Sequence, residues 1–158
     1  MAVEMAFPMS SLGWNVLAVL MLYGPAYLAN TGAVIFGKYL PRFTGMPVFR
    51  IDGGTSLKDG RRILGDGKTW NGFVGGGIFA GILLILSHWI WYGSQPPTHR
   101  FLIDPLAWVD GSEWFYIGGE WGAAFIMGFV LGIGTMLGDS LGSFVNRRRG
   151  HIREGDES

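Results

Sequence analysis

The sequence predicts an all-α integral membrane protein with three transmembrane helices and a long cytoplasmic loop between the first two. Charged residues make up only 15% of the 158 residues, whereas a soluble domain carries roughly 25%. These charges are clustered, and they leave three long stretches without Asp, Glu, Lys or Arg. Each stretch is long enough for the ~20-residue helix that crosses a bilayer core of ~30 Å. The length predicts one membrane domain over residues 1–158.

The composition also excludes several classes of protein. The chain has no Cys, which rules out a disulfide framework, a thiolate nucleophile and a Cys-ligated metal site. Its formal net charge is +0, so we expect no nucleic-acid partner. If the uncharged stretches were instead buried helices of a soluble protein, too little polar sequence would remain to cover their core.

The first predicted span covers about residues 12–37, within the uncharged stretch between Glu4 and Lys38. It contains Pro25 and Asn30, so it is not a plain lipid-facing helix. Asn30 suits either a hydrogen bond between helices or a ligand contact. A cleavable signal peptide is not expected, because nothing basic precedes this span.

The loop predicted at residues 38–70 has the densest chemical pattern. Asp-Gly pairs recur at Asp52, Asp59 and Asp66, and basic residues are interleaved with them. Turns alone would explain the Asp-Gly pairs, and anchoring to anionic lipid would explain the cations. The mixture favours phosphate chemistry, because carboxylates hold Mg²⁺ while Lys and Arg bind phosphates. The interleaved basic residues are Lys58, Arg61, Arg62 and Lys68.

The second predicted span covers about residues 71–92 and follows directly on Lys68 and Thr69. The free backbone N–H groups at the start of such a helix favour an anion. Gly72 and Gly76 form a small-xxx-small pair, which suits close packing against another helix.

The third predicted span covers about residues 121–145 and leads into a tail at residues 146–158. It contains Asp139, and a carboxylate within a span usually faces a partner or a water-filled cavity. Asp139 is therefore a functional candidate, with a structural pairing to an Arg of the loop or tail as the alternative. The same face carries Thr135, Ser143 and Asn146. A neighbouring face, predicted to contact the first two spans, carries Gly134, Gly138 and Gly142.

The distribution of Lys and Arg predicts the orientation. Of the 12 Lys and Arg residues, all but Arg100 lie in the loop 38–70 and the tail 146–158. The positive-inside rule then places that loop and the tail in the cytoplasm, and the N-terminus and the loop 93–120 outside. We therefore expect a multi-pass protein of the cell membrane. The outer loop is acidic and rich in Trp and Pro. We expect no chemistry there, because its acidic residues lack basic or metal-ligating partners: Asp104, Asp110, Glu113 and Glu120.

These signals meet at the cytoplasmic level of the predicted bundle. The end of the first span, the start of the second and the end of the third lie there, around a pocket open to water and to lipid. Such a pocket suits a reaction between a water-soluble phosphate compound and a lipid. Its predicted lining is Asp66, Lys68, Asp139, Ser143 and Arg147.

At these residues the chain resembles the archaeal CDP-archaeol synthases, which are relatives of the phosphatidate cytidylyltransferases. The matching stretches are 25–30, 51–54, 59–70 and 138–150, and the run Asp-Gly-Arg-Arg followed by Gly-Asp-Gly-Lys-Thr-Trp is the most specific. The resemblance implies a membrane cytidylyltransferase of lipid biosynthesis that uses Mg²⁺. Its substrates would be CTP and an unsaturated diether-glycerol phosphate, and its products a CDP-lipid and pyrophosphate.

The resemblance also implies roles for single residues. Asp66 and Asp139 would be catalytic metal ligands, and Lys68 would hold the phosphates of CTP. Arg147 and Arg148 would hold the lipid phosphate or the pyrophosphate. Further substrate-binding candidates are Asn30, Asp59, Arg61, Arg62, Thr69 and Ser143.

Two departures from the family pattern limit what the resemblance implies. A basic residue is usual where this chain has Asn146, and the family continues into two further spans, so the chain is expected to lack the C-terminal part. A non-catalytic scaffold that binds anionic lipid, a truncated inactive fragment and a transporter stay as alternatives. The sequence predicts neither the base and tail specificity nor the oligomeric state.

Overall fold

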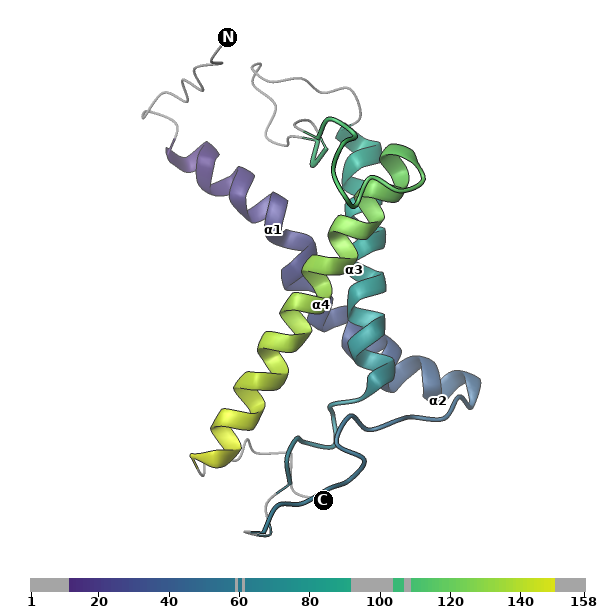
Figure 1. Cartoon of the computed structure of the whole chain (residues 1–158), viewed down its shortest axis with the longest axis vertical. Coiled ribbons are helices and arrows are strands. Elements are labelled where there is room, and N and C mark those ends of the chain that lie inside the picture. The colour runs from purple at the N-terminus through teal and green to yellow at the C-terminus, as the bar shows by residue number, and fades with distance from the viewer. Residues whose placement is uncertain (1–11, 59, 61, 92–103, 107–108, 150–158) are drawn as a thin grey trace.

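The computed structural model describes residues 12–58, 60, 62–91, 104–106 and 109–149, except for the side chains of residues 12–22 and 91. These residues form helices and connecting segments, with isolated bridges but no named strand in the described ranges. The elements are α1 (Leu12–Val34), the π-helix η2 (Ile35–Tyr39), α2 (Leu40–Thr44), α3 (Trp70–Trp91) and α4 (Gly119–Arg148) (Figure 1).

The first helical path runs beyond the predicted end at residue 37 and changes its hydrogen-bond pattern on the way. In η2 the backbone N–H of Leu40 donates to the carbonyl of Ile35, a wider turn than in an α-helix. Pro41 follows, and its ring has no N–H to donate. Gly45 ends α2 in the left-handed conformation, with φ 71°. As a result, α2 projects sideways from the lower end of α3 (Figure 1).

Helices α3 and α4 cross where both carry small residues. A Cβ built at Gly128 of α4 would lie 2.6 Å from the carbonyl oxygen of Ala80 in α3. At Gly132 a Cβ would lie 2.8 Å from the Cβ of Ala80. The two backbones therefore touch at this crossing, and a larger side chain would push them apart.

Helix α1 packs on α3 in the same manner. A Cβ at Gly72 would lie 2.9 Å from the carbonyl oxygen of Ala33, and one at Gly76 would lie 2.9 Å from that of Ala29. The predicted packing role of Gly72 and Gly76 is thus confirmed.

The prediction that the glycines near the end of the third span contact the first two spans is wrong for the described residues. Gly134, Gly138 and Gly142 have no neighbouring atom within 4 Å of a built Cβ. The reason is the crossing angle: beyond its contact with α3, the C-terminal half of α4 diverges from the other helices (Figure 1). The glycines that do pack on α3, Gly128 and Gly132, precede Gly134 by six and two residues.

Many large apolar side chains of α3 and α4 are exposed. Both helices are long and apolar enough to cross a membrane, and only 39% and 28% of their most apolar stretches are buried. A core helix of a soluble protein would be mostly buried, so these helices and their exposed apolar faces indicate a membrane protein. The side chains of α1 are described only from Tyr23 onward, and a third span stays a prediction.

The end of the bundle opposite to α2 contains a buried polar pair. Nδ1 of His88 lies 2.7 Å from Oδ1 of Asp104, which also accepts a hydrogen bond from the backbone N–H of Leu106. His88 is 1% exposed, and its ring packs edge-on against Trp121 at 4.8 Å between centroids. The expectation that the acidic residues of this loop have no basic partner is therefore wrong for Asp104.

Candidate functional site

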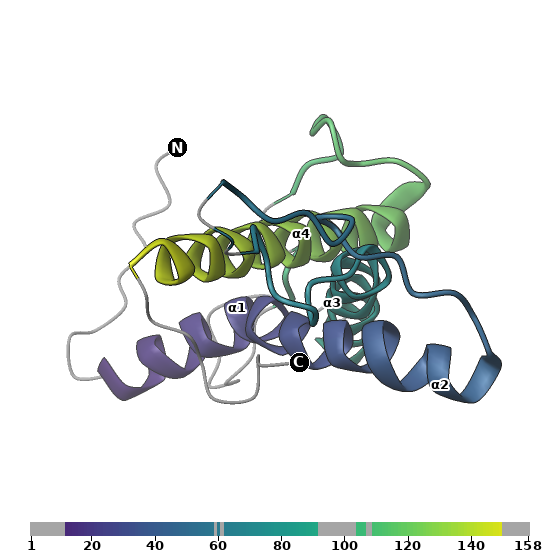
Figure 2. The ribbon, with the colours of Figure 1, turned by 90° about the horizontal axis from the view of Figure 1, so that it is seen from below.

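The segment between α2 and α3 is bound to the start of α3. The backbone N–H of Trp70 donates to the carbonyl of Phe49 at 2.8 Å, and that of Ile51 donates to Lys68 at 3.0 Å. The side-chain oxygen of Asn71 accepts from the N–H of Phe49 at 3.0 Å. Figure 2 shows the segment returning from the end of α2 toward α3 and α4.

Asp52 is buried within this segment and accepts hydrogen bonds from three of its residues. One carboxylate oxygen accepts from the N–H of Gly54 and from Nη2 of Arg62, each at 2.9 Å, and the other accepts from the N–H of Leu64 at 3.0 Å. The side chain is 1% exposed. Gly53 and Gly54 have φ values of 56° and 82°, which an Asp-Gly-Gly turn permits. Burial alone would raise the pKa of Asp52, but two backbone N–H groups and Arg62 outweigh it and hold the pKa below its ordinary value.

Asp66 lies between two guanidinium groups. Nη1 of Arg62 donates to one carboxylate oxygen of Asp66, and Nε of Arg50 lies 3.2 Å from the same oxygen. The hydrogen bond to Asp66 is the largest reason why the pKa of Arg62 is raised, ahead of the opposing effect of burial and the contribution of Asp52. Asp66 is therefore held by the same arginine that Asp52 positions.

Lys68 joins the segment to α4. Its ammonium group donates to Oδ2 of Asp139, which lies in the C-terminal half of α4. The two side chains are 22% and 31% exposed, so water reaches the pair. Two of the predicted catalytic residues thus meet in space, and the partner of Asp139 is a lysine of the loop rather than an arginine.

Thr69 caps the start of α3. Its hydroxyl oxygen accepts a hydrogen bond from the backbone N–H of Gly72 at 3.1 Å, and the residue is 5% exposed. A capping threonine satisfies one of the free N–H groups at a helix start. This geometry gives Thr69 a structural role, and its contact with substrate stays a prediction.

The other predicted residues lie along α1 and α4. Ser143 follows Asp139 by four residues in α4 and is half-buried. Arg147 and Arg148 form the last turn of α4, and the guanidinium carbon of Arg148 lies 5.4 Å from the ring centroid of Phe144. The side chain of Asn30 is exposed on α1. Asp59 and Arg61 lie outside the described residues.

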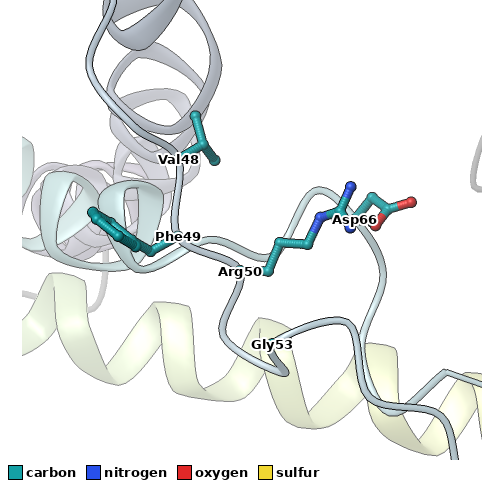
Figure 3. Close-up of a pocket in the computed structure, with 5 residues that line it drawn as sticks. All are labelled: Val48, Phe49, Arg50, Gly53 and Asp66. Atoms are coloured by element: carbon teal, nitrogen blue, oxygen red, sulfur yellow. Dashed lines mark ion pairs between the residues drawn. The ribbon is translucent and has the colours of Figure 1, made fainter.

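An open depression of about 540 Å³ lies beside Asp66. Its lining combines apolar and charged side chains, and Figure 3 shows Arg50 reaching toward Asp66 while Phe49 points the other way. The lining residues are Val48, Phe49, Arg50, Gly53 and Asp66.

The two predicted metal ligands, Asp66 and Asp139, each face a cation. Within the part of the chain that the structure describes, no three His, Asp or Glu side chains gather where they could hold a metal ion together. The two carboxylates do not form a metal site in which the protein supplies all of the ligands. They do suit Mg²⁺, which keeps several waters and takes other ligands from substrate phosphates. The carboxylates therefore fit an ion that takes most of its ligands from other molecules.

Sequence reasoning missed Arg50 and the buried pair of His88 and Asp104. The available signal for Arg50 is its position two residues before Asp52, which begins the Asp-Gly-Gly turn. For His88, the signal is an ionisable residue near the end of an apolar helix, where an unpartnered polar group would be costly.

Comparison with known proteins adds to this geometry. Residues 13–93 match the family model described as CarS-like, CDP-archaeol synthase. The chain is 38% identical over 124 residues to the CDP-archaeol synthase of Pyrococcus horikoshii, covering 78% of this chain and 54% of that protein.

Two further relatives carry the same description. The CDP-archaeol synthase of Thermococcus gammatolerans is 34% identical over 143 residues, covering 89% of this chain and 61% of that protein. That of Archaeoglobus fulgidus is 34% identical over 138 residues, covering 87% and 63%. The chain thus spans little more than half of the length of these relatives. No solved structure matches the chain.

Proposed function

Because the chain belongs to the CarS-like CDP-archaeol synthase family, we propose that it transfers a cytidylyl group from CTP to a diether-glycerol phosphate lipid. The observation that carries the proposal is the ion pair between Lys68 and Asp139, which joins the basic and acidic segment 50–69 to α4. It brings a phosphate-binding cation and a carboxylate together beside the start of α3.

In the proposed reaction, an oxygen of the lipid phosphate attacks the α-phosphorus of CTP. The bond from that phosphorus to the oxygen bridging the α- and β-phosphates breaks, and pyrophosphate leaves with the electron pair. Such transfers depend mainly on positioning and on neutralising the charge that develops on the phosphate oxygens. Lys68 holds the phosphates of CTP, while Arg147 and Arg148 hold the lipid phosphate or the departing pyrophosphate.

Mg²⁺ bound at Asp66 and Asp139 would supply charge neutralisation at the reacting phosphates. In the structure both carboxylates are paired with protein cations. Nucleotide phosphates would compete for Lys68, and this competition would leave the carboxylate of Asp139 available.

We also propose that the site faces the cytoplasm, at the membrane surface. The concentration of Lys and Arg in the residues around the site supports this orientation. The apolar, outward-facing surfaces of α3 and α4 support insertion in the bilayer. A lipid phosphate and a soluble nucleotide can both reach a site at that level.

The test is an assay of membranes that contain the full chain, given labelled CTP, Mg²⁺ and a diether-glycerol phosphate. We expect label to enter a CDP-lipid in the organic phase, and Asp139→Asn to lower the rate by about 100-fold or more, as losses of charge-stabilising groups commonly do. Asp110→Asn makes the same chemical change at an exposed carboxylate elsewhere and should leave the rate unchanged. Absence of CDP-lipid, or an undiminished rate in Asp139→Asn, would overturn the proposal.

A further inference from the structure

Four large apolar side chains are exposed between the end of α2, which contains Phe43, and the depression. Phe43, Met46, Val48 and Phe49 are 84%, 48%, 47% and 59% exposed. We call these four residues the apolar rim. The chain carrying them runs from the projecting end of α2 back to the start of α3 (Figure 1).

The inner end of the apolar rim is held firmly by the backbone. Both the N–H and the carbonyl of Phe49 are hydrogen-bonded, to Asn71 and Trp70. The side-chain nitrogen of Asn71 also donates to the carbonyl of Pro47 at 3.2 Å. Val48 lies between these anchored residues, so it and Phe49 present fixed apolar surface to their surroundings.

Cations accompany the apolar rim. Arg50 follows Phe49 directly, lines the same depression, and has a side chain that is 51% exposed. Its Nε faces Asp66, while the described part of the chain shows no hydrogen bond from its two terminal nitrogens. Lys38 and Arg42 are exposed just before the rim. Apolar side chains beside cations match a lipid that has an anionic headgroup.

We propose that the apolar rim binds the alkyl chains of an anionic glycerolipid and that Arg50 binds its phosphate in the depression. This inference rests on the proposed function and assigns the lipid subsite of the same site. A nucleotide base would cover one aromatic ring, whereas the rim extends over seven residues and includes three large apolar side chains besides Phe49. The lipid phosphate would then lie beside Asp66, within the site that Lys68 and Asp139 complete.

The chain has no Cys, so a single introduced thiol can report on the rim. An environment-sensitive fluorophore is attached to the thiol of the Val48→Cys variant. The labelled full chain in neutral detergent is then titrated with a short-chain dialkyl glycerol phosphate. We expect a saturable change in fluorescence. Trp114→Cys, at a residue 71% exposed near the other end of α3, is the matched control and should not respond.

Two comparisons test the phosphate contact. Arg50→Gln in the labelled chain should weaken the apparent affinity about tenfold, the scale of one charge-assisted hydrogen bond. Dialkyl glycerol without phosphate should bind about tenfold more weakly to the unchanged chain, which tests the contact even if Arg50→Gln fails to fold. Inorganic phosphate alone should leave the fluorescence at Val48→Cys unchanged.

Equal responses to dialkyl glycerol and its phosphate, or a response only to CTP, would overturn the lipid subsite. Absence of any response to lipid would also overturn the lipid subsite. It would favour a protein segment as the occupant of the apolar rim. The binding assay needs no turnover, so its outcome is separate from that of the cytidylyltransferase assay. CDP-lipid synthesis without a lipid response at the rim would refute this inference and leave the proposed function standing.

Discussion

Replacing Asp52 by Asn tests whether one buried carboxylate holds the site segment together. The substitution keeps the shape of the side chain and removes its charge. It also replaces one acceptor oxygen by an NH₂ donor, while three donors point at the present carboxylate: two backbone N–H groups and Arg62. At least one of these donors then faces another donor.

The cost follows from these contacts. A buried N–H left unsatisfied costs about 1–3 kcal/mol, and a hydrogen bond to a charged group contributes about 1.5–3 kcal/mol. Arg62 keeps its second carboxylate partner, Asp66. Part of the stabilisation from hydrogen bonds to charged groups is therefore retained. We therefore expect the free energy of opening of the segment around Leu64 to fall by about 2–4 kcal/mol.

Hydrogen exchange measured by mass spectrometry reports this opening directly. The amide of Leu64, which donates to Asp52, should exchange at least about 30-fold faster in Asp52→Asn. Asp110→Asn is the control, since Asp110 is an exposed carboxylate that accepts hydrogen bonds from Ser112. Exchange at Leu64 within about threefold of the parent, or an equal effect of Asp110→Asn, would refute the reasoning.

The lowered pKa of Asp52 adds a pH dependence with a definite sign. Because the pKa in the folded chain lies below the ordinary value of 3.8, the ionised carboxylate stabilises the fold above that value. This stabilisation is lost as the pH falls through the folded pKa. Intrinsic-rate-corrected protection of Leu64 should therefore fall at acid pH in the parent, and Asp52→Asn should lack this acid step.

Two further predictions concern the rest of the bundle. Gly128→Val should lower the free energy of unfolding by about 1–3 kcal/mol, because the added Cβ lies 2.6 Å from the backbone oxygen of Ala80. Thermal unfolding in detergent measures this, and Gly134→Ala, which meets no atom within 4 Å, should be neutral or stabilising by up to about 1 kcal/mol. His88→Ala removes the partner of Asp104, so the amide of Leu106, which donates to the same carboxylate, should exchange about fivefold faster; unchanged exchange there would contradict the role of the pair.

The helices were the most predictable part of the fold. The uncharged stretches predicted helices at residues 71–92 and 121–145, and α3 and α4 begin and end within a few residues of these bounds. Charge distribution is a strong signal here because an unpaired charge is costly inside a bilayer. The pairing of Asp139 with a cation follows from the same cost, although the sequence did not identify Lys68 as that cation.

The contacts that organise the site were not predictable in this way. The donors to Asp52 lie two, ten and twelve residues further along the chain, a spacing with no helical or strand period. The two glycine stripes of α4 have the same small-xxx-small spacing, but only Gly128 and Gly132 pack on α3. Which stripe packs depends on where the helices cross, and local sequence does not encode that position.

The link between Lys68 and Asp139 has a consequence for biogenesis. The two residues are 71 positions apart, so the ribosome delivers the lysine well before the aspartate. Until α4 has been synthesised and inserted, the ammonium group of Lys68 remains solvated by water or headgroups. Contacts of such long sequence separation form late, because they require the intervening chain to be ordered first. Formation of this ion pair is therefore tied to synthesis of α4, and a nascent chain that stalls before α4 carries Lys68 without the carboxylate that pairs with it.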